Sequence, residues 1–187
     1  MRLDQARLGI RLAHQAIENA VRTGQRTQPP DDLPAVFDEV GGVFVTLHTA
    51  LLRGCVGHPY PDQKIKAALI DAAISAALYD YRFPAVTADE LSHLKVEITL
   101  LTKPQRITDI NSIIIGKHGL IVKKGHRQGL LLPQVATEYG WTRQEFVDQT
   151  YVKAGLMPGE RDVELFEFEG QVFSEVQPGG EIIELIP

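Results

Sequence analysis

The residues best suited to chemistry lie in the segment Leu52-Arg53-Gly54-Cys55-Val56-Gly57, which holds the only cysteine of the chain. Glycine at positions 54 and 57 lets a ligand or a second strand approach the main chain closely. In an extended strand, residues two apart share a face, so the Arg53 guanidinium would lie beside the Cys55 thiol and favour the thiolate. Cys55 is therefore a candidate nucleophile, and Arg53, Gly54 and Gly57 are candidate binding residues.

Cys55 has a second interpretation, because free cysteine is among the most buried residue types and packs as a small hydrophobic residue. The catalytic interpretation requires a base near the thiol, and histidine is the usual choice. His58 is nearest in sequence, whereas His118 and His126 flank a later hairpin. We take His58 and His118 as the candidate catalytic histidines.

A binding role without catalysis is the alternative function. The Arg53-Gly54-Cys55 turn and the Pro133-Gln134 region would then form a pocket for a peptide or a small polar ligand. Gln134 follows a proline that opens a predicted helix, where its amide can serve in recognition. Replacing Cys55 by serine separates the two functions, since binding survives the change and covalent catalysis does not.

Composition excludes several classes of protein. The 187 residues are 44% hydrophobic and 23% charged, with no apolar run long enough to cross a bilayer. A single cysteine excludes an internal disulfide and a multi-cysteine metal site, and the histidines form no close-spaced ligand motif, so no metal is expected. The formal net charge of −5 argues against nonspecific nucleic-acid binding. The N-terminus lacks the apolar core of a signal peptide, which predicts a cytoplasmic protein.

The spacing of apolar residues predicts which elements carry these candidates. Three- and four-residue steps predict helices over residues 3–20 and 65–76, with Asp4 and Asp62 as candidate N-caps. A third helix begins with a capping-box pattern at Thr142 and Glu145. Alternation and β-branched content predict strands at residues 42–47, 51–57 and 94–100, the first two forming a hairpin.

The second half of the chain resembles the first. Gly42-Val43-Phe44-Val45 matches Gly119-Leu120-Ile121-Val122, and Arg53-Gly54-Cys55-Val56 falls against Gln128-Gly129-Leu130-Leu131. Two repeats, about 42–101 and 119–176, would each contain strand, strand, helix and strand. This order predicts an α+β fold for one domain over residues 1–187, in which Leu130 takes the place of Cys55.

Several motifs follow one another along nearly the whole chain. They are, in order, Leu52-Arg53-Gly54-Cys55-Val56-Gly57, Tyr81-Arg82-Phe83-Pro84, Val96-Glu97-Ile98, Lys117-His118-Gly119-Leu120, Gly129-Leu130-Leu131-Leu132-Pro133-Gln134-Val135-Ala136 and Lys153-Ala154-Gly155-Leu156. Together they resemble the AMME-syndrome chromosomal region protein family. The resemblance implies a compact, barrel-like sheet of two β-β-α-β-like repeats with flanking helices. Arg82, within the second motif, joins the candidate binding residues.

The family resemblance does not settle an activity. It implies a pathway shared with Memo-like and radical S-adenosylmethionine proteins, although this chain has no three-cysteine iron-sulfur motif, and no cofactor is predicted. Tyr151 occupies the position of a second cysteine in many relatives, which disfavours a mechanism that needs two thiols. The expectation is a protein that either uses Cys55 as a nucleophile or binds a ligand or protein partner without catalysis.

Overall fold

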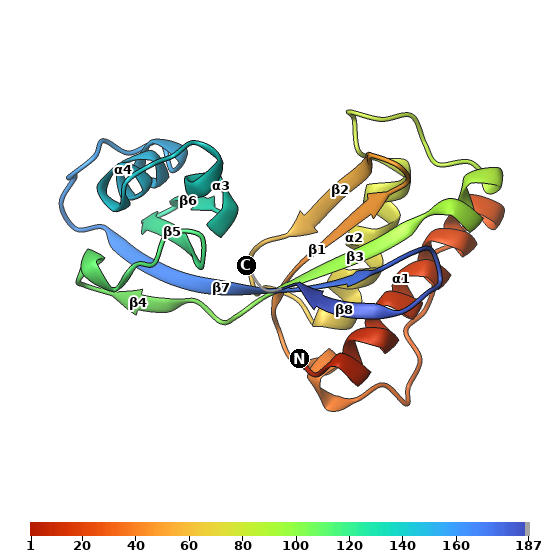
Figure 1. Cartoon of the computed structure of the whole chain (residues 1–187). Helices are drawn as coiled ribbons and strands as arrows, with labels where there is room; N and C mark the ends of the chain where they lie inside the picture. Colours follow the sequence, from red (N-terminus) through yellow and green to blue (C-terminus); the bar gives the residue numbers. More distant parts are fainter. Residues whose placement is uncertain (186–187) are drawn as a thin grey trace. The chain divides into compact units, whose positions relative to one another are not determined.

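A computed structural model describes residues 1–185 (Figure 1). The chain forms two compact units. Unit 1 contains Met1–Leu101 and the C-terminal segment that begins at Gln171, and unit 2 contains Thr102–Gly170. The predicted α+β class, with antiparallel strands and flanking helices, is confirmed, and the internal repeat stays a prediction. That these units make up one domain stays a prediction.

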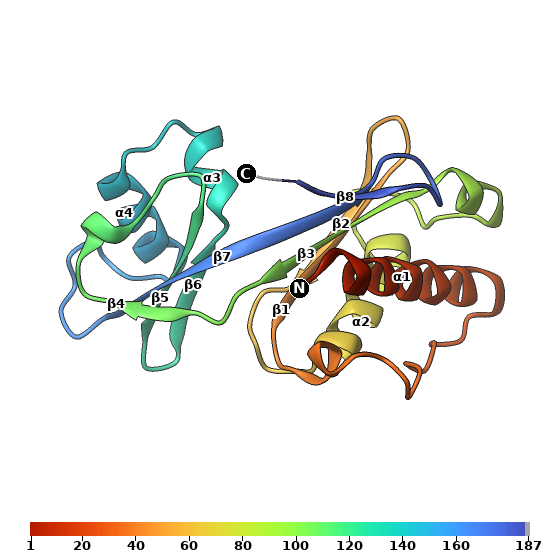
Figure 2. The same cartoon turned by 60° about the horizontal axis from the view of Figure 1, so that its bottom comes forward.

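Unit 1 packs its helices on one face of an antiparallel sheet. The first strand pairs with the second and the third, and Figures 1 and 2 show both helices on the same side of these strands. The elements are α1 (Leu3–Thr23), η1 (Ala35–Asp38), β1 (Gly42–His48), β2 (Leu52–His58), α2 (Ile65–Leu78), η2 (Ala88–His93), β3 (Lys95–Leu101), the second half of β7 (Glu164–Glu175) and β8 (Ile182–Leu185).

The core of unit 1 lies between the helices and this face of the sheet. Val43, Val45 and Leu47 alternate along β1 and are fully buried, as the period of two requires. The side of α2 that meets them is rich in alanine, which lets the helix approach the strands closely; its buried alanines are Ala68, Ala72, Ala73, Ala76 and Ala77.

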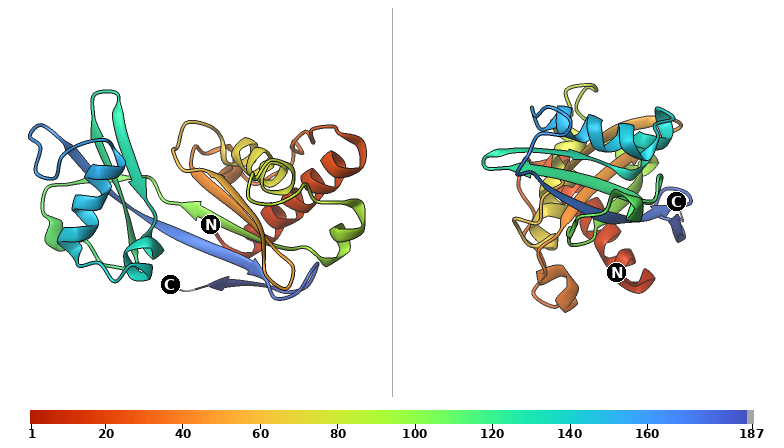
Figure 3. Two further views of the ribbon diagram at one scale, coloured as in Figure 1. Left: turned by 90° about the horizontal axis from the view of Figure 1, so that it is seen from above. Right: turned by 90° about the vertical axis from the view of Figure 1, so that its left-hand side faces the viewer.

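Unit 2 has a smaller core under a second hairpin. Its elements are β4 (Gln105–Ile107), η3 (Ile110–Ser112), β5 (His118–Lys124), β6 (Arg127–Leu131), α3 (Pro133–Glu138), α4 (Arg143–Lys153) and the first half of β7. Helix α4 lies against β5 and β6, as Figure 3 shows. The core side chains are Ile113, Leu120, Ala136, Phe146 and Val147.

One of the predicted helix starts is correct and two are wrong. The Thr142–Glu145 capping box is present, with the Thr142 backbone N–H donating to Glu145 Oε2 at 2.8 Å. Helix α1 instead has Arg2 as its N-cap, because Asp4 lies inside the first turn, and α2 begins after Lys64 rather than after Asp62. Within residues 1–185, no helix is both long and apolar enough to cross a membrane.

Candidate functional site

Cys55 lies in the middle of β2, on the face of the sheet that points away from α1 and α2. It pairs with Thr46 of β1, whose neighbours Val45 and Leu47 point into the core, so Thr46 and Cys55 share the opposite face. The thiol is half-buried, and the Thr46 hydroxyl donates to its Sγ over 3.4 Å. Cys55 is thus neither a core side chain nor a fully exposed one.

The backbone of Cys55 is held by two side chains that follow α2. Strand β2 lies at the edge of the sheet, so every second N–H and C=O lacks a strand partner. At Cys55 the N–H donates to Asp80 Oδ2 at 2.9 Å, and the carbonyl accepts from Arg82 Nη2 at 3.2 Å. We call Asp80 and Arg82 the edge pair, because their side chains replace a neighbouring strand at this position.

The edge pair is an ion pair between a buried acid and a partly exposed base. The Asp80 side chain is 4% exposed and that of Arg82 is 43% exposed, with Nη2 of Arg82 at 2.7 Å from Asp80 Oδ2. The Arg82 side chain, and next to it the backbone N–H groups of Cys55 and Arg82, hold the pKa of Asp80 well below its usual range. Asp80, with a further contribution from Cys55, raises the pKa of Arg82. The guanidinium is therefore a permanent charge bonded to the backbone of Cys55.

Arg53 does not have the role that the sequence predicted. Its Nε and Nη2 donate to the two oxygens of Glu90 at 2.7 and 3.1 Å, and Nη1 donates to the Pro84 carbonyl at 2.9 Å. Hydrogen bonding from Arg53, followed by that from Thr87, lowers the pKa of Glu90 to about 2. With its side chain only 11% exposed, Arg53 fastens the η2 segment to β2 instead of binding a ligand anion.

Gly54 and Gly57 serve packing rather than ligand approach. A Cβ on Gly54 would overlap the carbonyl oxygen of Ala76 in α2, and one on Gly57 would overlap the ring of Phe44. Neither has a positive φ. Only hydrogen fits at either position, so packing alone accounts for both glycines, and a role in binding stays a prediction.

His58 does not face Cys55. The two residues are three apart in one strand, so their side chains point to opposite faces of the sheet. His58 pairs with Val43, a core residue, and lines a groove on the helix side of unit 1. The structure therefore does not bring His58 to this thiol.

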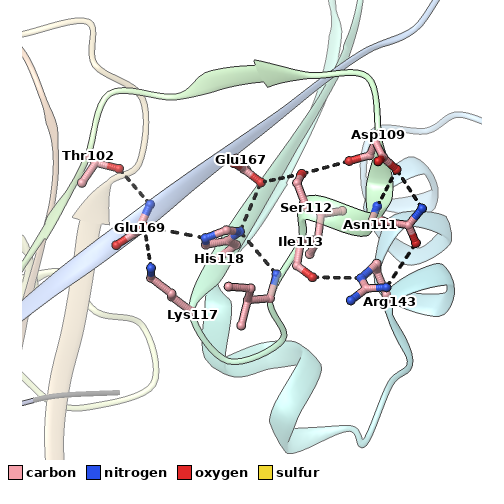
Figure 4. A network of polar contacts seen from close by, with 11 residues as sticks. Thr102, Asp109, Asn111, Ser112, Ile113, Lys117, His118, Arg143, Glu167 and Glu169 are labelled. Carbon is pink, nitrogen blue, oxygen red and sulfur yellow. Dashed lines mark hydrogen bonds and ion pairs between the residues drawn. The ribbon is translucent and has the colours of Figure 1, made fainter.

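His118 belongs to unit 2, in the network that Figure 4 shows. Its Nδ1 lies 3.1 Å from Glu167 Oε2 and accepts from the Ile114 N–H at 3.3 Å. Nδ1 cannot donate a hydrogen bond to Glu167 and also accept one from the Ile114 N–H, so only one of these two contacts is a hydrogen bond at a time. Nε2 lies 3.6 Å from Glu169 Oε1, which Lys117 also contacts. His118 is 7% exposed and links the start of β5 to β7.

Gln134 also belongs to unit 2, where it is exposed at the second position of α3 after Pro133. A role in binding stays a prediction. No group of three or more histidine, cysteine, aspartate or glutamate side chains within the described part of the chain is arranged to hold a metal ion.

Two further groups on the outer face of the unit 1 sheet were not predicted as site residues. Glu97 of β3 lies across Thr46 from Cys55, so the three form one row over β2, β1 and β3. His48 Nε2 lies 3.9 Å from Glu97 Oε2 and is buried without a hydrogen-bond partner among residues 1–185. The hairpin register could have identified Thr46. Arg82 was already a candidate through its motif, whereas the contact of Asp80 with β2 depends on how α2 ends and has no local signal.

Comparison with known proteins identifies relatives for nearly the full length. A sequence profile of the AMMECR1 family matches residues 10–173. A protein of Methanosarcina acetivorans is 48% identical and one of Pyrococcus furiosus is 43% identical, covering 96% and 92% of this chain and 96% and 89% of their own lengths. The crystal structure of an uncharacterised protein from Pyrococcus horikoshii is similar with a TM-score of 0.85 and 39% identity, covering 100% of this chain and 99% of that one. The chain belongs to the AMMECR1 family.

Proposed function

We propose that this protein binds a small ligand with a carboxylate or phosphate group at the edge of β2, where Cys55 and Arg82 lie together. The observation that carries the proposal is the fixed guanidinium that donates to the Cys55 carbonyl. Asp80 holds Nε and Nη2 of Arg82 at 2.9 and 2.7 Å, while the side chain remains 43% exposed. An arginine with its planar group already oriented loses little entropy when it binds an anion.

Arg82 has capacity left for a ligand. Its Nη1 makes no hydrogen bond or ion pair with the residues described here, because Asp80 and the Cys55 carbonyl use Nε and Nη2. Arg53, by contrast, uses all three of its nitrogens within unit 1. Of the two arginines in the family motifs, only Arg82 can therefore offer a free donor near Cys55.

The experiment is a thermal-shift and calorimetric screen of small anions: inorganic phosphate, citrate, and short mono- and dicarboxylates. We expect at least one to bind with saturation, and Arg82→Gln to weaken it by about tenfold or more, the loss of one charged hydrogen bond. Arg106→Gln is the matched control, since Arg106 is 62% exposed and forms a long 3.7 Å pair with Glu164. Equal binding by wild type and Arg82→Gln, or no binding by any anion, contradicts the proposal.

A second candidate function is covalent catalysis with Cys55 as nucleophile. It is favoured by the outer face of the sheet, where the Thr46 hydroxyl contacts Sγ and Glu97 continues the same row. Glu97 with His48 supplies acid–base groups in place of His58. The Cys55→Ser variant distinguishes the two functions. It should still bind the anion under either function. A covalent adduct, read as a mass increase of the intact protein, should form with the wild type and not with this variant if Cys55 is a nucleophile.

We also propose a cytoplasmic location, and the family resemblance supports a pathway shared with Memo-like and radical S-adenosylmethionine proteins. Co-purification with each partner expressed beside this chain tests the assignment. A complex that Arg82→Gln weakens and Arg106→Gln does not would also tie the partner to the proposed site. If neither class of partner associates with this chain, at concentrations up to the solubility of the proteins, then direct binding to these partners is contradicted.

A further inference from the structure

A groove of about 460 Å³ lies on the helix side of unit 1, away from Cys55. It runs from the end of α1, at Ala20 and Gly24, across Arg26 to the outer side of α2 and to His58 at the end of β2. Ligand pockets in proteins have volumes of roughly 300–1,000 Å³. The groove therefore has room for one small molecule.

The groove contains a nitrogen with an unmet hydrogen bond. His58 Nε2 is buried and has no hydrogen-bond partner within residues 1–185. Leaving a buried polar atom unpaired costs about 1–3 kcal/mol, so such atoms in folded proteins usually have a partner. His58 lines the groove, so a small rotation of its side chain would turn Nε2 towards a molecule bound there, which would supply that partner. Imidazole either donates or accepts through Nε2, according to its tautomer.

Arg26 and Asp71 supply further polar groups to the groove. Both Nε and Nη2 of Arg26 donate to the same oxygen, Oδ1 of Asp71, at 3.0 and 2.7 Å. Oδ2 of Asp71 and Nη1 of Arg26 make no contact with other residues of unit 1 that the structure describes. The pair thus presents one free acceptor and one free donor in the same groove.

The remaining lining combines the polar residues Gln25 and Ser75 with apolar and aromatic side chains. Ile74 and Leu78 are half-buried on α2, and Tyr79 is 72% exposed where the helix ends. An exposed aromatic ring above an apolar strip suits a flat molecule, because stacking buries both ring faces at low entropic cost.

We propose that this groove binds a planar heteroaromatic ring with N–H donors and ring-nitrogen acceptors, the chemical class of the free purine bases. The ring contacts His58 Nε2 with one edge, meets the free donor and acceptor of Arg26 and Asp71 with another, and stacks on Tyr79. This site is independent of the proposed anion site, since Cys55 and His58 lie on opposite faces of β2.

The test is a titration of the ¹⁵N-labelled full chain with adenine and with hypoxanthine, followed by amide chemical shifts. Benzyl alcohol, which has an aromatic ring without ring nitrogens, is the matched probe. We expect saturable shifts centred on His58 and the outer side of α2 with at least one purine and weaker shifts with benzyl alcohol. His58→Leu should weaken binding by about tenfold, the loss of one buried hydrogen bond, while His58→Gln keeps part of it.

Exposed variants keep the test valid if His58→Leu fails to fold. Tyr79→Ala should weaken binding several-fold, whereas Tyr81→Ala, at a residue that is 96% exposed and does not line the groove, should leave it unchanged. Arg82→Gln should also leave purine binding unchanged, which separates this proposal from the anion site. The absence of a saturable shift with either purine would contradict the proposal. So would a folded Tyr79→Ala variant that binds a purine as tightly as the wild type does.

Discussion

The edge strands of the two units use the same glycine and differ at the next residue. Gly54 in β2 and Gly129 in β6 both pack so closely on a helix, at Ala76 and at Ala154, that a Cβ would overlap helix backbone atoms. After Gly54 comes Cys55, whose backbone is held by the edge pair. After Gly129 comes Leu130, opposite Ile121, with no side chain bonded to its backbone in the described part of unit 2.

This comparison separates residues that helix packing requires in both units from residues that are specific to unit 1. A glycine that recurs at equivalent positions of the proposed repeats is explained by helix packing and implies no ligand. The thiol, the buried Asp80 and the partly exposed Arg82 occur together only beside Gly54. The functional interpretation therefore rests on Cys55 and Arg82, and the motif glycines belong to the fold.

The largest expected effect tests the shared glycine. Gly54→Ala and Gly129→Ala should each lower the free energy of unfolding by about 2–3 kcal/mol, because the new methyl group meets helix backbone that cannot move aside. Urea unfolding measures both. Leu51→Ala, at a residue 79% exposed in the first hairpin, serves as control. A large loss for Gly129→Ala alone would return Gly54 to the candidate ligand contacts.

The edge pair should have the next largest effect. Asp80→Ala leaves the Cys55 N–H and the Arg82 donors without their acceptor, which should destabilise unit 1 by about 2 kcal/mol. Glu160→Ala in unit 2, which removes an acid that bonds Lys124 and Arg127 nearer the surface, should cost clearly less than Asp80→Ala. Comparable losses in the two variants would show that the edge pair is an ordinary surface ion pair.

Acid should weaken the edge pair selectively. Folding lowers the pKa of Asp80 and that of Glu90, the latter to about 2, so their contribution is complete above the unfolded values of about 4 and is lost as pH falls towards the folded ones. Urea unfolding of wild type and Asp80→Asn at pH 7, 4 and 2.5 checks this. The stability difference between them should shrink below pH 4, and parallel curves would refute the assignment.

A small effect is expected at the thiol itself. Cys55→Ser should change the free energy of unfolding by about 1 kcal/mol or less, because Cys55 is half-buried and its backbone contacts do not depend on sulfur. Guanidinium unfolding measures this change. A loss of several kcal/mol would instead favour the interpretation of Cys55 as a structural core residue.

Local patterns in the sequence predicted most of the elements, because period-two alternation and three- to four-residue steps arise within one segment. The first hairpin, with Cys55 in its second strand, follows from such a pattern. The same alternation, applied to Cys55 and His58, places the two side chains on opposite faces of the strand, because they are three residues apart. The sequence could not reveal that Arg53 bonds Glu90 or that Arg82 bonds Cys55, since these partners lie 37 and 27 residues apart. Such contacts depend on tertiary packing.

The central claim is that an accessible Cys55 thiol lies beside the Arg82 guanidinium. Comparing the alkylation rates of the folded protein with iodoacetate, which is anionic, and iodoacetamide, which is neutral, tests it directly. We expect Arg82→Gln to lower the iodoacetate-to-iodoacetamide rate ratio roughly threefold or more, the effect of one nearby charge in water, and Arg106→Gln to leave it unchanged. A ratio unaffected by Arg82→Gln, or a thiol that reacts with neither reagent until the protein unfolds, would contradict the account.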